Sequence, residues 1–257
     1  GQRRPGCRTL IMKHFHPCLV IPCYNHGREL LGYLPRVTAC GYPVIVVDDG
    51  SAKEEASLIC QACAATGATL ITLPQNCGKW RAVLAGMDEA RRRGYTHVLQ
   101  CDADGQHNEQ HISEFLDKGE QHPAALICGQ PRYGEDVPPA RLYGRRITNF
   151  FVSLETAGAC HIDAMCGFRL YPLERTLGII RRGGISSGMA GDIELLVRCC
   201  WDGMPVLGHE VEVCYPEGGR SNFRMLRDNV LISWAHTKLC TAALLHPWRL
   251  VRAHRPR

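Results

Sequence analysis

Short apolar segments alternate with longer amphipathic segments through the first half of the chain. Apolar segments predict strands at Cys18–Pro22, Val44–Val47, Thr69–Leu73, Thr96–Cys101 and Ala125–Cys128. The segments between them predict helices at Gly27–Cys40, Lys53–Thr66, Lys79–Arg93 and Asn108–Gln121. Strands that alternate with helices of about 10–15 residues form a mostly parallel sheet covered by helices on both faces. We therefore predict an α/β fold with a mostly parallel central sheet flanked by helices.

The second half of the chain is less regular. It predicts a helix at Arg141–Ala157, a helix that opens near Asp192, a strand at Val206–Val213 and helical stretches between Phe223 and His246. The 257 residues suffice for one large α/β domain with a sizeable core. We predict a single domain over residues 16–240, a disordered N-terminal extension at 1–15 and a basic C-terminal tail at 241–257.

Charge and cysteine usage narrow the class of protein. Seven arginines lie near the two ends of the chain, and their combined charge exceeds the net charge of +5. The rest of the chain is therefore slightly acidic, and a nucleic-acid partner is not expected. The 15 cysteines are odd in number and lie inside apolar runs or side by side. This pattern predicts reduced, buried thiols and a cytoplasmic protein.

Polar residues follow each of the first four predicted strands. Asn25, the pair Asp48–Asp49, Lys79 and the pair Asp102–Asp104 come directly after successive strands or open the next helix. The carboxyl ends of parallel strands share one edge of a sheet, where such folds bind ligands. Taken singly, each segment is also ordinary turn or helix-cap chemistry. Taken together, they predict a site for a nucleoside diphosphate with its metal.

Asp102 and Asp104 are the predicted metal ligands. Two carboxylates on the same side of an extended segment repel each other unless a cation lies between them, and hard oxygen ligands suit Mg²⁺ or Mn²⁺. His107 and His111 lie four residues apart, but the metalloprotease pattern needs Glu directly after the first His. We predict an ordinary surface pair there.

At this point the chain resembles the family 2 glycosyltransferases, which have the GT-A fold. The resemblance covers about residues 16–240 and is strongest to the dolichyl- and polyprenyl-phosphate sugar synthases. It rests on five segments in order: Val20-Ile21-Pro22-Cys23-Tyr24-Asn25, Val47-Asp48-Asp49-Gly50-Ser51, Asn76-Cys77-Gly78-Lys79, Asp102-Ala103-Asp104-Gly105-Gln106-His107 and Cys166-Gly167-Phe168-Arg169-Leu170-Tyr171-Pro172.

The resemblance implies a role for each matching residue. The nucleotide would be held by Pro22, Tyr24, Asn25, Asp48, Asp49, Lys79 and Asp102. The metal and diphosphate would be held by Asp102, Asp104 and Gln106, with Arg169 near the diphosphate. Asp192 and Glu194 would be the acceptor-side acids. A hydroxyl acceptor would need one of them as a base, whereas a phosphate acceptor would not.

The resemblance further implies an inverting transfer from a UDP- or GDP-sugar, with Mg²⁺ or Mn²⁺, to a lipid-linked acceptor such as polyprenyl phosphate or a lipid hydroxyl. Trp80, where many relatives have Gly, would narrow the donor pocket. A nucleotidyltransferase of similar fold and a non-catalytic nucleotide-sugar-binding domain are the alternatives.

Residues 223–257 combine apolar and basic side chains, and Trp248 precedes a run of arginines. This composition predicts peripheral binding to an anionic membrane surface, at the inner face of the membrane.

Overall fold

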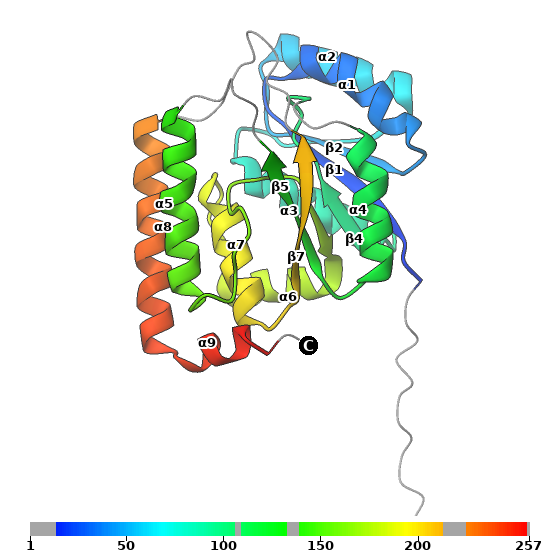
Figure 1. Ribbon diagram of the computed structural model, residues 1–257. Helices are drawn as coiled ribbons and strands as arrows, with labels where there is room; N and C mark the ends of the chain where they lie inside the picture. Colours follow the sequence, from blue (N-terminus) through cyan, green and yellow to red (C-terminus); the bar gives the residue numbers. More distant parts are fainter. Residues whose placement is uncertain (1–13, 106–108, 133–138, 213–224, 256–257) are drawn as a thin grey trace, which may run out of the picture.

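The computed structural model describes residues 14–105, 109–132, 139–212 and 225–255. A seven-stranded sheet lies at the centre of the molecule, with the strand order β3-β2-β1-β4-β6-β5-β7 (Figure 1). Its strands are β1 (Pro17–Cys23), β2 (Val44–Asp48), β3 (Thr69–Thr72), β4 (His97–Gln100), β5 (Leu126–Arg132), β6 (Arg169–Pro172) and β7 (Val206–Glu212). Neighbouring strands are parallel except at β6, which is antiparallel to both β4 and β5.

Helices cover both faces of this sheet. They are α1 (Gly27–Ala39), α2 (Lys53–Thr66), α3 (Lys79–Arg92), α4 (Gln110–Gln121), α5 (Pro139–Glu155), α6 (Leu173–Gly183), α7 (Ala190–Trp201), α8 (Met225–Leu245) and α9 (Trp248–Ala253). In Figure 1, α5 and α8 lie side by side and run parallel, outside the layer that contains α7. None of the helices within the described ranges combines the length and apolar character needed to cross a bilayer.

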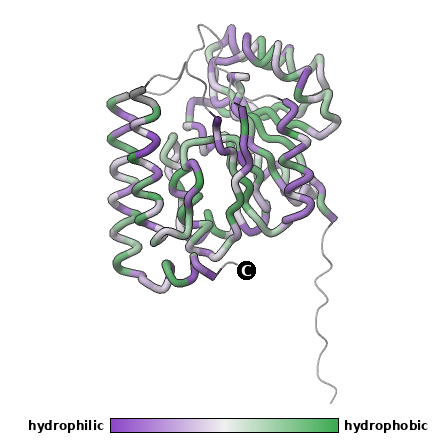
Figure 2. Tube along the Cα trace, viewed as in Figure 1, coloured by the Kyte–Doolittle hydropathy of each residue, from purple (hydrophilic) through white to green (hydrophobic). Residues whose placement is uncertain are grey.

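Alternation along the central strands divides the core into two layers. In β1, Leu19 and Ile21 contact the layer formed with α1, α2 and α4, whereas Cys18 and Val20 contact the layer formed with α3, α6, α7 and α8. Successive side chains of a strand point to opposite faces, and here both faces are buried. β1 is therefore apolar along its length, and green stretches run through the centre of the molecule in Figure 2.

The predicted α/β fold with a mostly parallel sheet is confirmed. Neither β6 nor α6 was predicted. In β6, a buried four-residue strand that begins with Arg169 has no alternating pattern to reveal it. Residues 241–245 complete α8, and residues 248–253 form α9, so these parts of the predicted tail are helical. Most of the predicted N-terminal extension lies outside the described residues.

The cysteines behave as small apolar side chains. Nine of the described ones are buried. Burial raises the pKa of Cys18 and of Cys23 to about 12, which makes both thiols poor nucleophiles at neutral pH. This agrees with the expectation that they serve the core.

The close approach of α3 to β1 gives a first prediction. A Cβ at Gly86 would lie 2.4 Å from the Cγ1 of the buried Val20, so Gly86→Ala should destabilise the fold by about 1–3 kcal/mol. Gly32 on α1 has no atom within 4 Å of its Cβ position. Gly32→Ala should therefore stabilise by about 0.5–1 kcal/mol. Urea unfolding of both variants measures this, and equal effects would contradict the packing described here.

Candidate active site

The loops after β1 and β2 are joined by hydrogen bonds. Asn25 has a left-handed backbone (φ 55°), its N–H donates to Ser51 Oγ at 2.9 Å, and its Oδ1 accepts from the Ala52 N–H at 2.8 Å. Asp48 is buried and accepts from the Ser51 N–H at 2.9 Å. Pro22 lies near the end of β1, and both it and Tyr24 are half-buried beside this junction. These contacts fix the first two loops relative to each other.

Asp49 extends this network to the loop before α3. Its two carboxylate oxygens accept from the N–H groups of Cys77 (2.8 Å) and Gly78 (2.9 Å). Burial raises the pKa of Asp49 and the neighbouring Asp48 adds to the rise, although the two amide hydrogen bonds oppose it. Both oxygens of Asp49 are thus engaged within the protein, so this carboxylate sets the position of the loop that precedes Lys79.

Lys79 lies between two carboxylates at the start of α3. Its Nζ is 2.9 Å from Asp102 Oδ1 and 3.5 Å from Asp192 Oδ2. Burial alone would lower the pKa of Lys79, but Asp102, Asp192 and Asp104 outweigh it and hold the pKa above its ordinary value. Lys79 is therefore a permanent positive charge that three carboxylates surround.

The predicted metal ligands lie in the turn that follows β4. The extended geometry ends at Gln100, and residues 103–104 form a turn in which the Ala103 side chain enters the core. Asp102 and Asp104 remain half-buried, and both add to the effect of burial in raising the pKa of Tyr33. Gln106, the third predicted ligand, lies outside the described residues.

Gly167 lets the side chains of Lys79 and Asp102 pack closely, which the sequence did not predict. A Cβ at this position would lie 2.6 Å from Lys79 Nζ and 2.7 Å from Asp102 Oδ2. Glycine is thus the residue that leaves room for the ion pair. The only signal in the sequence is that Gly167 precedes Phe168 and Arg169 in the segment shared with the family.

Arg169 lies in the core beneath Lys79 and Asp192 rather than at the surface of the site. The side chain is fully buried, and its guanidinium donates to the carbonyls of Cys166 (2.8 Å), Ala164 (2.7 Å) and Asp192 (2.7 Å). The structure therefore does not bring the guanidinium to the expected place beside a diphosphate. Its contact with the Asp192 carbonyl instead holds the first turn of α7.

The two acids of α7 point in different directions. Asp192 faces Lys79, and its buried Oδ1 has no hydrogen-bond partner among the described residues. Glu194 instead accepts from the N–H (2.9 Å) and hydroxyl (2.7 Å) of Ser186 and from Lys238 Nζ (2.8 Å). Burial raises the pKa of Glu194, but these hydrogen bonds lower it by more, so the net pKa is below its ordinary value. Of the two, only Asp192 belongs to the group around Lys79.

Trp80 packs in the core against the start of α7. The side chain is fully buried, the backbone N–H of Trp80 donates to Ser187 O at 2.9 Å, and the indole ring lies 6.2 Å from the Tyr171 ring. A Cβ at Gly191 would lie 2.2 Å from the Trp80 ring. Because Trp80 is covered by these residues, the expectation that it narrows a donor pocket is replaced by a packing role beneath Asp192.

The arrangement around Lys79 suits a divalent cation with a diphosphate. Asp102 and Asp104 offer hard carboxylate oxygens, which Mg²⁺ and Mn²⁺ prefer. The buried Oδ1 of Asp192 also lacks a donor among the described groups. The residues present therefore fit the predicted metal.

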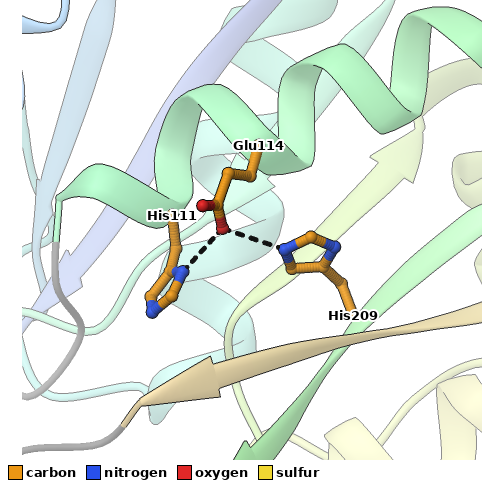
Figure 3. A group of neighbouring side chains, drawn as sticks. All are labelled: His111, Glu114 and His209. Atoms are coloured by element: carbon orange, nitrogen blue, oxygen red, sulfur yellow. Dashed lines mark hydrogen bonds and ion pairs between the residues drawn. The ribbon is translucent and has the colours of Figure 1, made fainter.

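A second group of potential metal ligands joins α4 to the edge strand β7. Glu114 Oε2 lies 2.8 Å from His111 Nδ1 and 3.0 Å from His209 Nε2 (Figure 3). His111 Nε2 accepts from the Glu212 N–H at 3.1 Å, so the proton of the neutral ring is on Nδ1. A metal on Nδ1 would require a proton on Nε2, facing that N–H. The geometry therefore favours a hydrogen-bonded link between α4 and β7. His107 lies outside the described residues.

Known proteins share both the sequence pattern and the fold. The family model described as Glycosyl transferase family 2 matches residues 18–177. The chain is 28% identical to polyprenol monophosphomannose synthase of Mycolicibacterium smegmatis, over 88% of this chain and 84% of that protein. It is 30% identical to human dolichyl-phosphate beta-glucosyltransferase, over 61% of this chain and 54% of that protein.

Solved structures of glucosyl-3-phosphoglycerate synthase from Mycobacterium tuberculosis have a similar fold. The complex with phosphoglyceric acid has a TM-score of 0.66 at 15% identity, covering 88% of this chain and 80% of that one. The complex with Mn²⁺, UDP and glucosyl-3-phosphoglycerate has a TM-score of 0.58 at 16% identity, covering 94% and 81%. These similarities and the family match favour a glycosyltransferase over the nucleotidyltransferase and non-catalytic alternatives. The chain belongs to glycosyl transferase family 2, has the GT-A fold and is a glycosyltransferase.

Proposed function

We propose that this enzyme transfers a sugar from a UDP- or GDP-sugar to a lipid-linked acceptor, with inversion and with the help of Mg²⁺ or Mn²⁺. The observation that carries the proposal is the position of Lys79 between Asp102 and Asp192, next to the loops after β1, β2 and β3. A cation flanked by acids at the carboxyl edge of a parallel sheet suits a nucleoside diphosphate and its metal.

The nucleoside would bind against the first two loops. Pro22, Tyr24 and Asn25 lie beside the segment that contains Asp48 and Asp49. Since Asp48 and Asp49 accept hydrogen bonds from backbone amides, we assign them the positioning of these loops. Lys79 would then contact the diphosphate with its charge.

The diphosphate would bind near the turn after β4. Asp102, Asp104 and Gln106 would hold the divalent cation, which when bound would neutralise charge on the departing nucleoside diphosphate. Gly167 keeps the space beside Asp102 open. Arg169 acts as a positioning residue, because it holds the Asp192 carbonyl and two further carbonyls of the adjacent segment.

In the reaction, an acceptor oxygen forms a bond to the anomeric carbon as the bond from that carbon to the diphosphate oxygen breaks. The electron pair of the broken bond leaves with the nucleoside diphosphate. If the acceptor is a hydroxyl, its proton goes to the Asp192 carboxylate; if it is polyprenyl phosphate, no base is needed. The hydrogen bonds that Glu194 accepts from Ser186 and Lys238 support Asp192 rather than Glu194 in this role.

Two observations support a lipid acceptor at a membrane surface. The relatives reported above include enzymes named for polyprenol and dolichyl phosphate. On the outer pair of helices, exposed apolar side chains recur at spacings of three and four residues: Tyr143, Ile147, Phe150 and Leu154 on α5, and Leu226, Val230 and Trp234 on α8. An apolar helical face of this kind suits peripheral contact with lipid at the cytoplasmic face of a membrane.

A thermal-shift screen tests the donor class. UDP-, GDP- and dTDP-sugars are added to the protein with and without Mn²⁺. We expect a UDP- or GDP-sugar to raise the melting temperature more with the metal than without it. No shift with any donor would contradict the proposal.

Loss of a metal ligand gives a second prediction. Asp104→Asn should lower transfer by about 100-fold or more, because a charged ligand is lost where charge develops in the transition state. Its stability should change by less than about 1 kcal/mol, since Asp104 is half-buried in a turn. Asp117→Asn, on the exposed face of α4, is the matched control and should leave transfer unchanged. Near wild-type transfer by Asp104→Asn at low metal concentration would refute the assignment.

A third prediction concerns the space beside the ion pair. Gly167→Ala places a methyl group 2.6 Å from Lys79 Nζ, so the Lys79–Asp102 pair must move apart and transfer should fall roughly 10-fold or more. Gly188→Ala, whose Cβ meets no atom within 4 Å, should keep full activity. Steady-state transfer rates and thermal melts of both variants measure this. Unimpaired transfer by Gly167→Ala would show that the pair's geometry is not critical.

A further inference from the structure

A basic pocket lies on the face of α7 opposite Lys79 and its partners Asp102 and Asp192. Its volume is about 310 Å³, and residues of α6, α7, α8 and α9 line it. Glu194, which points away from Lys79, is part of its wall, whereas Asp192 is not. This volume lies at the small end of the range of ligand pockets, so it suits a compact group.

The wall of the basic pocket carries an excess of positive charge. Its ionisable side chains comprise five cations and two carboxylates, so three positive charges are in excess: Arg182, Arg198, Lys238, Arg249 and Arg252 against Glu194 and Asp202. Both carboxylates already have partners. Asp202 pairs with Arg175 and Arg182, and Glu194 pairs with Lys238 and lies 4.0 Å from Arg198.

Arg249 and Arg252 have no carboxylate partner in the part of the chain that the structure describes. The Arg249 guanidinium instead lies over the Trp201 ring, 5.0 Å from its centre, which holds the charge at the pocket wall. Arg198 is nearby: burial lowers the pKa of Arg198, and repulsion from Arg249 lowers it further, against the attraction of Glu194. Adjacent guanidinium groups of this kind bind a phosphate well, because its several oxygens accept from more than one donor.

The surroundings of the basic pocket are apolar. Trp248 is 61% exposed at its wall, and Leu244, Leu245 and Val251 are exposed on the same helices, α8 and α9. A free phosphate ion would make no use of these side chains, whereas a lipid would place its headgroup among the arginines and its chains against the apolar residues.

We propose that the basic pocket binds the phosphate headgroup of an anionic membrane lipid, at a site separate from the one that holds donor and acceptor. This site would hold α8 and α9 at the membrane surface. The inference goes beyond the proposed function, because headgroup binding requires neither a nucleotide sugar nor turnover.

The test is co-sedimentation with vesicles of phosphatidylcholine, with or without phosphatidylglycerol. The full chain is compared with Arg249→Gln/Arg252→Gln, and with Arg28→Gln/Lys53→Gln as a control of equal charge. Arg28 and Lys53 are exposed on α1 and α2, at the opposite end of the molecule from α9 in Figure 1. Thermal melts establish that each variant folds, and Arg252→Gln alone, at an exposed position, replaces the double variant if that one does not.

We expect the pocket variant to bind the anionic vesicles about 10-fold or more weakly and the control to match the wild type within about 2-fold. All three proteins should bind UDP or GDP with Mn²⁺ alike. Equal losses in both variants would overturn the proposal, since binding would then follow net charge alone. Equal binding to vesicles without phosphatidylglycerol would also overturn it. Calorimetric titration with inorganic phosphate distinguishes the sources: tight phosphate binding without vesicle binding would rule out the lipid headgroup. If no variant bound either UDP or GDP, the result would count against the proposed function but not against this pocket.

Discussion

The buried carboxylate of Asp49 holds the two backbone amides that precede α3, and the position of Lys79 depends on it. A hydrogen bond to a charged group contributes about 1.5–3 kcal/mol, so two such bonds fix this loop firmly. With the loop fixed, α3 places Trp80 in the core against Gly191, where α7 begins. Lys79, one residue earlier, then lies between Asp102 of the β4 turn and Asp192 of α7. The buried Asp49 thus positions Lys79, which links the turn after β4 to the start of α7.

The first turn of α7 is supported from two sides. Arg169 holds the Asp192 carbonyl from within the core, and Glu194 binds Ser186 of the preceding loop and Lys238 of α8. These contacts leave the Asp192 carboxylate facing Lys79 while Glu194 faces the basic pocket. The same helix therefore separates the proposed transfer site from the proposed lipid site. This arrangement explains how an acid near the site, Glu194, can be buried and charged without taking part in the chemistry.

The sequence predicted the first half of the fold well, because its strands are uninterrupted apolar runs and its helices have regular amphipathic spacing. It also predicted which turns meet, since parallel strands bring Asn25, Asp49, Lys79 and Asp102 to one edge. It did not predict the antiparallel strand β6, whose four residues show no period. Nor could it show which of these side chains are already hydrogen-bonded within the protein. Whether Asp49 and Arg169 face a ligand or the backbone depends on burial, and the different directions of Asp192 and Glu194 depend on how α7 packs against α3 and α8.

The central claim is that Lys79, Asp102 and Asp104 form one site for a divalent cation and a nucleoside diphosphate. The most direct measurement is a calorimetric titration of Mn²⁺ into the protein alone and into the protein saturated with UDP or GDP. If both ligands share this site, the nucleotide must raise the affinity for Mn²⁺, and Mn²⁺ must raise the affinity for the nucleotide by the same factor. We expect such mutual strengthening for at least one of the two nucleotides. Affinities for Mn²⁺ that do not change when either nucleotide is bound would contradict the account.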